Sequence, residues 1–376
     1  MRTALLLLAG TMSVSLMAEQ PPGPKWKLQF FHDKLNSTLI FEDIECPSLN
    51  HCVAVGAINS DSGKLHPTAV VTSDGGEHWT TVELKDTPYS VFFVNDSVGW
   101  IAAEKKIWRT EDGGLKWSDM SKLDQIEQLA FLDSSHGWAA GRDGEIYETT
   151  NSGKQWKKAP VTGLAWPNNQ VAFQGVGFSR PETGFLIGTA FPYGQLRPAR
   201  PDWLDPQRAM QYREPPAMSF AAVTKDGGQT WVAGLPFSKT GTVSNVHAMA
   251  NGHALVTMRY PNGAGWPTAV LDVDPATGSQ TVVYRQKDRV ARDALPLPGG
   301  GAMIAAIEPP GTATSLPIPG KLRMIQQDAQ DTWRELSVDY RAVAANVLLA
   351  SPDGKHFWAA TDTGMILRFD PDLGTK

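Results

Sequence analysis

Residues 72–79 read Thr-Ser-Asp-Gly-Gly-Glu-His-Trp, and this octapeptide recurs three more times along the chain. The copies at 110–117, 149–156 and 224–231 share the pattern Thr-x-Asp/Asn-x-Gly-x-x-Trp. So specific a pattern does not recur by chance, and self-similarity of this kind is the signature of a repeat protein. The octapeptide therefore decides the fold class.

The octapeptide has the chemistry of a turn between two strands. An apolar run leads into the Thr, as at residues 69–71. The Asp or Asn can accept hydrogen bonds from backbone N–H groups of its own turn, and Gly supplies the positive φ. The Trp then opens the next strand and covers the turn. We interpret the recurring residues as structural rather than catalytic: Asp74, Trp79, Asp112, Trp117, Asn151, Trp156, Asp226 and Trp231.

The composition agrees with a chain of short strands and many turns. Among 376 residues there are 35 Gly and 27 Pro, and only 19% of the chain is charged. The length suits one large repeat domain or two ordinary domains. The net charge is -5 and no basic run stands out, so the sequence does not support nucleic-acid binding. No cofactor is expected.

A second repeating element lies between the octapeptides. It is a small residue followed by an apolar strand, and it begins near residues 51, 98, 136, 183, 252, 301 and 355. Another strand precedes each copy, and a third and a fourth follow it. Four short antiparallel strands repeated in this way form a propeller blade. The sequence therefore predicts an all-β protein, a seven-bladed β-propeller with four-stranded antiparallel blades.

The last blade is expected to borrow a strand from the start of the chain. It has three strands of its own, the third at residues 365–369, and residues 25–31 read as an orphan strand. Trp26 would take the place of the octapeptide Trp. Pairing the first strand with the last blade removes an exposed sheet edge. We therefore expect residues 19–376 to form a single closed propeller.

The N-terminus has the features of a signal peptide. Arg2 precedes an apolar run that starts at Ala4 and continues to about Met17. Cleavage after Ala18 gives a signal peptide of residues 1–18, and cleavage after Ser15 is the alternative. The protein is therefore expected to be exported, to a periplasmic or extracellular location.

The two cysteines are predicted to form a disulfide. Cys46 and Cys52 flank a short turn between two strands, where the sulfur atoms of facing strands can meet. An exported protein favours such a bridge. A metal site on this pair alone would lack further ligands.

An insertion in blade four, residues 191–218, lies between the second and third strands of the blade. Shorter extensions occupy the equivalent place at 60–67, 260–267 and 308–320. Such loops emerge opposite the octapeptide turns and rim the channel. Aromatic residues among arginines are typical of interface hot spots. The predicted partner-binding residues are Tyr193, Arg197, Arg200, Trp203, Arg208, Tyr212 and Arg213. In the alternative interpretation, the insertion caps the channel and buries its aromatic rings.

The octapeptides resemble the Asp-box, or BNR, repeat shared by sialidases, some glycoside hydrolases and sortilin-type receptors. The longer run from Phe131 to Trp156 resembles the photosystem II stability/assembly factor family of seven-bladed propellers. The resemblance covers blades one to four and weakens from about Lys239 onward. It implies an exported or lumenal assembly factor without known catalysis. That family engages its client through a patch of arginines, and the arginines of the blade-four insertion form an analogous group.

We therefore expect the protein to bind a protein partner in an envelope or membrane complex without catalysing a reaction. We also expect the chain to be a monomer. The alternative is a carbohydrate-active hydrolase, sialidase-like or another glycosidase, or a glycan-binding propeller. A sialidase would need an Arg-Ile-Pro signature near the first blade, and that signature is missing. Xyloglucan hydrolases of the Asp-box type use two propellers. A paired-carboxylate site would draw on Asp202, Asp205 or Glu214.

Blade five carries a group of metal-ligating residue types, His247, Met249, His253 and Met258. Such residues can hold copper. They lie in and between alternating strands, however, where Met is ordinary core filler. We therefore expect no metal there.

Overall fold

The structure is a computed structural model that describes residues 25–191, 217–261, 264–311, 319–327, 332–369 and 371. The partner-binding residues predicted in the blade-four insertion lie outside these ranges, as do Asp202, Asp205 and Glu214. The described residues form thirty strands and one 3-10 turn, η1 (Asn168–Gln170). None of their helical elements has the length and apolarity needed to cross a bilayer.

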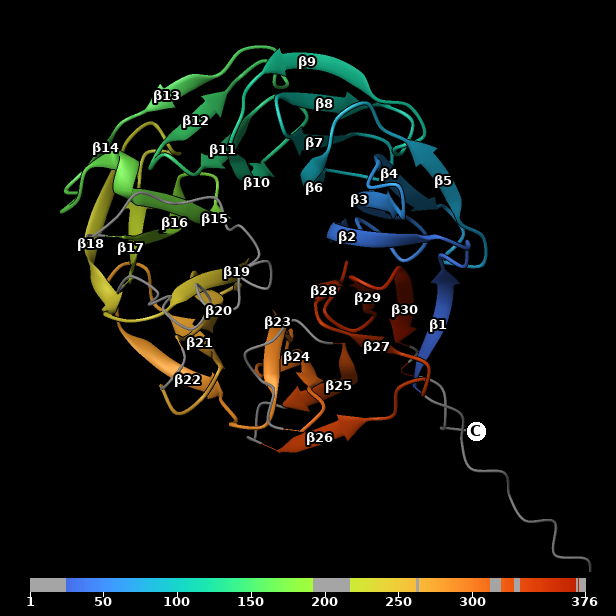
Figure 1. Ribbon diagram of the computed structural model, residues 1–376. Helices are drawn as coiled ribbons and strands as arrows, with labels where there is room; N and C mark the ends of the chain where they lie inside the picture. Colours follow the sequence, from blue (N-terminus) through green and yellow to red (C-terminus); the bar gives the residue numbers. More distant parts are fainter. Residues whose placement is uncertain are drawn as a thin grey trace, which may run out of the picture.

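Seven sheets are arranged in a ring, as the sequence predicts (Figure 1). Blade one contains β2 (Ser37–Glu45), β3 (Cys52–Ser60), β4 (Leu65–Thr72) and β5 (Thr80–Glu83). Blade two contains β6 (Pro88–Phe93), β7 (Gly99–Ala103), β8 (Lys106–Thr110) and β9 (Ser118–Lys122). Blade three contains β10 (Ile126–Phe131), β11 (Gly137–Gly141), β12 (Ile146–Thr149) and β13 (Lys157–Ala159).

The remaining blades follow the same order from channel to rim. Blade four contains β15 (Val171–Arg180), β16 (Thr183–Ala190), β17 (Met218–Thr224) and β18 (Trp231–Ser238). Blade five contains β19 (Thr242–Ala248), β20 (Ala254–Arg259), β21 (Thr268–Val273) and β22 (Gln280–Tyr284). Blade six contains β23 (Val290–Pro296), β24 (Ala302–Glu308), β25 (Gly320–Gln327) and β26 (Trp333–Leu336).

Blade seven confirms the predicted closure. Its three own strands are β28 (Val347–Ala350), β29 (Trp358–Thr361) and β30 (Met365–Phe369). The first strand of the chain, β1 (Trp26–Phe31), pairs antiparallel with β30 as the fourth strand. Trp26 is fully buried, and its ring centroid lies 5.4 Å from that of Phe369 and 6.5 Å from that of Phe357.

Three details were not anticipated from the sequence. The short strand β14 (Val161–Thr162) pairs parallel with β18 and gives blade four a fifth strand. In blade six, β27 (Val343–Ala344) pairs with β25. The extension expected at residues 60–67 is largely a hairpin, because β3 and β4 stay paired as far as Asn59 and Leu65.

The core is divided among the interfaces between neighbouring blades. Side chains from facing sheets interdigitate, as where Trp100 of blade two stacks on Phe131 of blade three with ring centroids 3.8 Å apart. The Trp100 indole N–H also donates to the carbonyl oxygen of Ser152, at 2.9 Å. Each blade therefore depends on its two neighbours for burial of its apolar faces.

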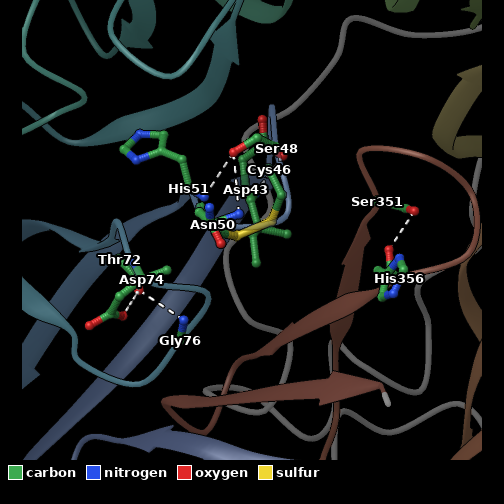
Figure 2. Close-up of a disulfide and its surroundings, with 12 residues drawn as sticks. Asp43, Cys46, Ser48, Asn50, His51, Thr72, Asp74, Gly76, Ser351 and His356 are labelled. Carbon is green, nitrogen blue, oxygen red and sulfur yellow. Dashed lines mark hydrogen bonds between the residues drawn. A yellow bond between two sulfur atoms is a disulfide. The ribbon is translucent and has the colours of Figure 1, made fainter. Parts of the chain in front are cut away.

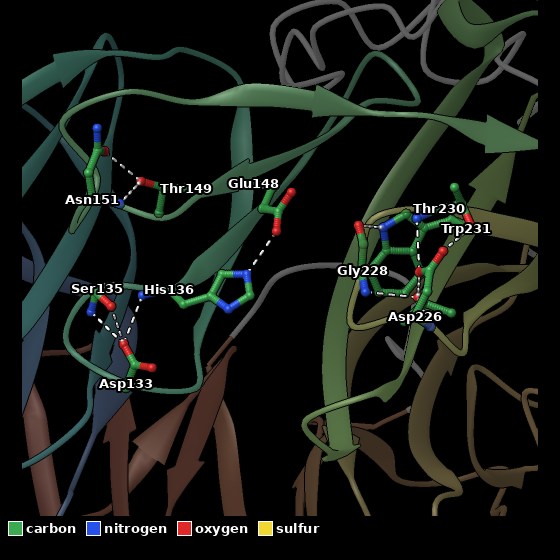
Figure 3. Close-up of polar contacts among 11 residues, drawn as sticks. Asp133, Ser135, His136, Glu148, Thr149, Asn151, Asp226, Gly228, Thr230 and Trp231 are labelled. Atoms are coloured by element: carbon green, nitrogen blue, oxygen red, sulfur yellow. Dashed lines mark hydrogen bonds and ion pairs between the residues drawn. The ribbon is translucent and has the colours of Figure 1, made fainter.

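The octapeptide turns lie on one face of the ring. In the first turn, the Thr72 hydroxyl donates to Asp74 Oδ1 at 2.8 Å and accepts the Gly76 N–H at 2.9 Å. Asp74 Oδ1 also accepts the His78 N–H at 2.9 Å. Gly75 has a φ of 74°, in the left-handed region. The other three turns repeat this geometry around Asp112, Asn151 and Asp226. Figure 3 shows the turns of Asn151 and Asp226.

The predicted disulfide is present. Cys46 and Cys52 are bonded at the end of β2 and the start of β3, and both are buried (Figure 2). Ser48 holds the short loop between them by accepting the N–H groups of Asn50 and His51. The bridge therefore fixes the connection between the first two strands of blade one.

Replacing both cysteines by alanine is expected to lower the free energy of unfolding by about 2 kcal/mol, because the bridge closes a short loop in the unfolded chain. Thermal melts of the oxidised protein, the reduced protein and the double variant would measure it. The reduced protein serves as the matched control and should have the same melting temperature as the double variant. Identical melting of all three would show that the bridge contributes no stability.

Candidate functional site

The inner strands of six blades share a β-bulge that places one residue at the edge of the channel. The pairing of first and second strands skips one residue in each of these blades, while the described pairs of blade seven show no skip. Within the described part of the chain, each inner strand ends its sheet and has no hydrogen-bonded neighbour on the channel side (Figure 1). We call the skipped residues the bulge ring: Glu42, Tyr89, Glu127, Gln174, Ser244 and Arg292.

In blades one, three and six, the residue after the bulge fastens its blade to the next one. Asp43 accepts the Val91 N–H of blade two at 2.8 Å, and Gln128 accepts the Val176 N–H of blade four at 2.7 Å. Asp293 of blade six accepts the Leu349 N–H of blade seven at 2.8 Å. These bonds fix the inner strands relative to one another, so the bulge ring has a rigid base.

Blades one to three make the ring acidic on one side. Glu127 forms an ion pair with Arg142, whose guanidinium lies 5.9 Å from the ring centroid of Tyr89. Burial raises the pKa of Glu42, and the negative charges of Asp362 and Glu127 raise it further. Glu42 therefore sits among negative groups without a cation of its own.

Blade six makes the opposite side basic. Burial lowers the pKa of Arg292, and the positive charge of Arg259 acts in the same direction, while Asp362 opposes both. The Nε of Arg292 is buried and has no hydrogen-bond acceptor. Gln174 Oε1, in blade four, is likewise buried and has no donor. The two sides of the channel mouth thus carry opposite charges, and two buried polar atoms, Arg292 Nε and Gln174 Oε1, lack hydrogen-bond partners.

A second set of titratable groups lies further along the same inner strands. His247 Nε2 lies 2.8 Å from Asp293 Oδ1. Burial raises the pKa of Asp43 to about 6, although backbone N–H groups of Val91 and Ile44 oppose this. Burial and the charge of Asp43 raise the pKa of Glu45 to about 8, and His247 opposes the rise. Glu45 and His247 come from blades one and five, so their charges influence each other across the middle of the ring.

The metal-ligating residue types of blade five do not gather into one site. His247 faces Asp293, whereas His253 Nδ1 lies 2.7 Å from Asp272 Oδ1 and Met258 is fully buried in the core. One group of three described side chains could hold a metal ion, Asp74, Glu77 and His78. All three are exposed on the first octapeptide turn, where Asp74 already accepts hydrogen bonds from its own turn.

A small cavity of about 80 Å³ lies between blades one and two, away from the channel. Leu84, Ile101, Trp108 and Trp117 form its apolar walls, and Lys85 is among the charged residues beside them. The Lys85 ammonium group lies 5.7 Å from the Trp108 ring centroid. The cavity is a gap between packed blades rather than part of the bulge ring.

The comparisons with known proteins agree with the fold. No protein-family model matches the sequence, and no curated protein matches it. A structure of YCF48 bound to a D1 peptide has a TM-score of 0.58 and 18% identity, covering 93% of this chain and 97% of that one. YCF48 from Cyanidioschyzon merolae has a TM-score of 0.57 and 16% identity, covering 92% and 99%. The likeness is one of fold.

A carbohydrate-active enzyme is also similar in structure. The GH74 xyloglucanase from Xanthomonas campestris has a TM-score of 0.59 and 11% identity, covering 92% of this chain and 53% of the enzyme. The present chain therefore matches about half of that protein. Assembly factors and glycosidases share this architecture, so the function must be argued from the site.

The sequence reasoning missed the bulge ring. Glu42 and Arg292 stand in unremarkable strands, and nothing in their local sequence marks a bulge. The one available signal was a polar residue at equivalent places in the inner strands, which is charged in blades one, three and six.

Proposed function

We propose that this chain is an exported, non-catalytic propeller that binds a protein partner and serves as an assembly factor for an envelope or membrane protein complex. The observation that carries the proposal is the correspondence over almost the whole chain with YCF48 propellers, one of them solved with a D1 peptide. The Asp-box run from Phe131 to Trp156 supports the same relationship. Export rests on the apolar segment within residues 1–18.

We place the partner on the face of the channel mouth opposite the octapeptide turns. Two features support this choice. The blade-four insertion, 191–218, follows β16 and therefore leaves from that face, and its sequence has aromatic and arginine residues suited to an interface. The bulge ring adds rigid groups of both charges on blades one and six.

Replacing residues 195–214 by a short Gly/Ser linker is expected to leave the melting temperature nearly unchanged and to abolish partner capture. The reason is that strands β16 and β17 remain paired along their full length without the insertion. Pull-down from the native envelope fraction, compared between the intact chain and the variant, would measure capture. A matched linker replacement at 262–263 in blade five should retain it. Unfolding of the variant, or capture that survives, would place the surface elsewhere.

A glycosidase remains the second candidate, because carboxylates do gather at the channel mouth. Glu42 lies near Asp362 and Glu127, and its raised pKa is the property that a general acid requires. Hydrolysis of xyloglucan oligosaccharides and chromogenic glycosides by the intact chain would test it. Turnover that disappears in Glu42→Gln and persists in Glu83→Gln, on the outer strand β5, would favour the enzyme.

A further inference from the structure

Five large apolar side chains are exposed on the face of the ring opposite the octapeptide turns. The exposed fraction is 94% for Leu35, 91% for Tyr340, 54% for Leu65, 45% for Phe31 and 40% for Val343. They lie at strand ends and in loops of blades six, seven and one, which are neighbours in the ring (Figure 1). We call these five side chains the apolar arc. Exposed apolar groups gathered in this way indicate a contact surface.

Hydrogen bonds join the segments of the apolar arc into one surface. The Asp61 N–H donates to the Asn36 carbonyl oxygen at 3.0 Å, which holds the β3–β4 hairpin against the segment between β1 and β2. The turn between β29 and β30 makes the other two connections. One of its backbone carbonyls accepts the His32 N–H at 2.9 Å, and its Thr363 hydroxyl donates to the Val343 carbonyl oxygen at 2.8 Å. The arc is therefore continuous from blade one through blade seven to blade six.

The apolar arc is a local feature and does not follow from the propeller fold. The links between the other pairs of neighbouring blades reach the same face, and the structure describes all of them. None exposes a large apolar side chain: they are residues 84–87, 123–125, 160–170, 239–241 and 285–289. The exposure in blades six, seven and one therefore needs its own explanation.

Lysines stand beside the apolar side chains. Lys34 and Lys64 directly precede the two leucines of the arc, and Lys321 is the strand partner of Val343. All three lysines are exposed, and none forms an ion pair with another described residue. An ammonium group next to an exposed apolar side chain suits a surface that offers both anionic oxygen atoms and hydrocarbon.

The acidic residues beside the arc leave the lysines in excess. Asp339 forms an ion pair with Arg341 at 2.6 Å. Asp362 is half-buried, and its Oδ1 accepts a backbone N–H at 3.0 Å. Asp33 and Asp61 are exposed in the same segments as the lysines. Three lysines therefore stand against two exposed carboxylates along the arc, whereas the whole chain has a net charge of -5.

The form of the arc favours a bilayer over a protein as the surface that it contacts. Leu35 and Tyr340, the two most exposed of its side chains, project from separate loops. Hot spots of protein interfaces instead pack into well-formed pockets. Projecting apolar side chains with neighbouring lysines are typical of proteins that lie on a membrane surface, and Tyr is enriched at the level of the lipid headgroups.

We propose that the apolar arc docks this face of the propeller on the surface of a phospholipid bilayer. The apolar side chains enter the interface between headgroups and acyl chains, and Lys34, Lys64 and Lys321 pair with lipid phosphates. The inference rests on the proposed function and deepens it, because a propeller held at the membrane meets a client in a membrane complex. It also turns the face that carries the blade-four insertion toward that client.

Sedimentation of the purified chain with protein-free vesicles tests the proposal. One set of vesicles is pure phosphatidylcholine, and the other contains phosphatidylglycerol as well. The chain is expected to sediment with both and to bind the second more tightly, since lysines near an anionic surface are attracted to it. Sedimentation with neither set would overturn the proposal.

Variants of the exposed residues locate the contact. Leu35→Ser and Tyr340→Ser should each weaken vesicle binding about tenfold, because an apolar side chain no longer leaves water. Neither side chain is buried, so the melting temperatures should stay unchanged. Leu235→Ser on β18 is the matched control, since Leu235 is 84% exposed and lies outside the arc. Unchanged vesicle binding by the double variant of the arc would contradict the proposal.

Charge reversal tests the lysines separately. Lys34→Glu combined with Lys64→Glu should weaken binding to the vesicles with phosphatidylglycerol by about tenfold or more, and binding to phosphatidylcholine less. Lys154→Glu, on the third octapeptide turn and therefore on the opposite face, should bind as the parent does. An equal loss in both charge variants would mean that only the overall charge matters, which contradicts a docking arc.

A fluorescent label shows whether the arc enters the bilayer. Cys46 and Cys52 are bonded to each other, so Leu35→Cys provides a single reactive thiol for an environment-sensitive dye. The dye's emission should rise when vesicles are added, and the same dye on Leu235→Cys should not respond. Sedimentation of the labelled chain without a rise at position 35 would show that another face binds, and would overturn the proposal.

Partner capture from a detergent-solubilised envelope fraction separates this inference from the proposed function. No bilayer is present there, so the variant with Leu35→Ser and Tyr340→Ser should capture the partner as the parent does. Loss of capture by this variant would make the arc a protein interface and overturn the docking. Vesicle binding by an intact chain that captures no partner would support the docking and contradict the proposed function.

Discussion

Removal of residues 19–33 is expected to abolish cooperative folding. Strand β1 supplies the fourth strand of blade seven, and Trp26 is fully buried in a cluster that joins blades six and seven. Without β1, strand β30 loses its outer partner and the ring loses its closure. Circular dichroism and tryptophan fluorescence during thermal and urea unfolding would measure the effect. A truncated chain that melts like the full-length protein would show that the closure does not hold the fold.

A point variant provides a milder version of the same experiment. Trp26→Ala should destabilise the protein by about 3–5 kcal/mol, the usual cost of emptying a buried tryptophan site. Trp333→Ala on β26 is the matched control, because Trp333 is 40% exposed and its loss leaves no sealed cavity. Equal melting of the two variants would contradict the closure.

The second large effect is a fall in stability as the pH rises from about 4 to 8. Burial raises the pKa of Asp43 to about 6 from 3.8, and of Glu45 to about 8 from 4.5. Burial lowers the pKa of His247, but the charge of Asp293 and its hydrogen bond outweigh this effect. The pKa of His247 therefore lies above its ordinary value. In this range the folded protein retains protons that the unfolded chain releases, so the free energy of unfolding decreases with pH. The stabilisation is complete at pH values below the pKa values of the unfolded chain. It is lost as the pH rises through the pKa values of the folded protein.

The part of the loss that comes from Glu45 should be on the order of 3–5 kcal/mol across that range, and Glu45→Gln should remove that part. The amide is neutral at every pH and mimics the protonated carboxyl group, so the variant should be more stable than the parent at the upper end. Glu83→Gln, on the outer strand of the same blade, is the control and should keep the parent's pH dependence. Urea unfolding at several pH values gives the comparison. A parent chain that becomes more stable with rising pH would contradict the assigned environments.

Several features of the fold could be predicted because they are encoded locally. Seven apolar second strands count the blades, and the orphan strand at Trp26 identifies the closure. The Cys46–Cys52 disulfide follows from a short separation across a strand turn. The edge strand β14 and the pairing of β27 with β25 could not be foreseen, since two-residue strands form only where a sheet edge happens to be open beside them.

The sequence by itself determined the architecture, because each octapeptide turn and each strand carries its own pattern of glycine, proline and apolar residues. Only the tertiary structure decided which charged residues act together. Glu42 and Arg292 are far apart in the chain, and each looks like an ordinary strand residue. They share one channel mouth because the ring closes blade seven between them and because a bulge presents each at the inner edge. The charged neighbours of both residues follow from the closure of the ring, and no local pattern records them.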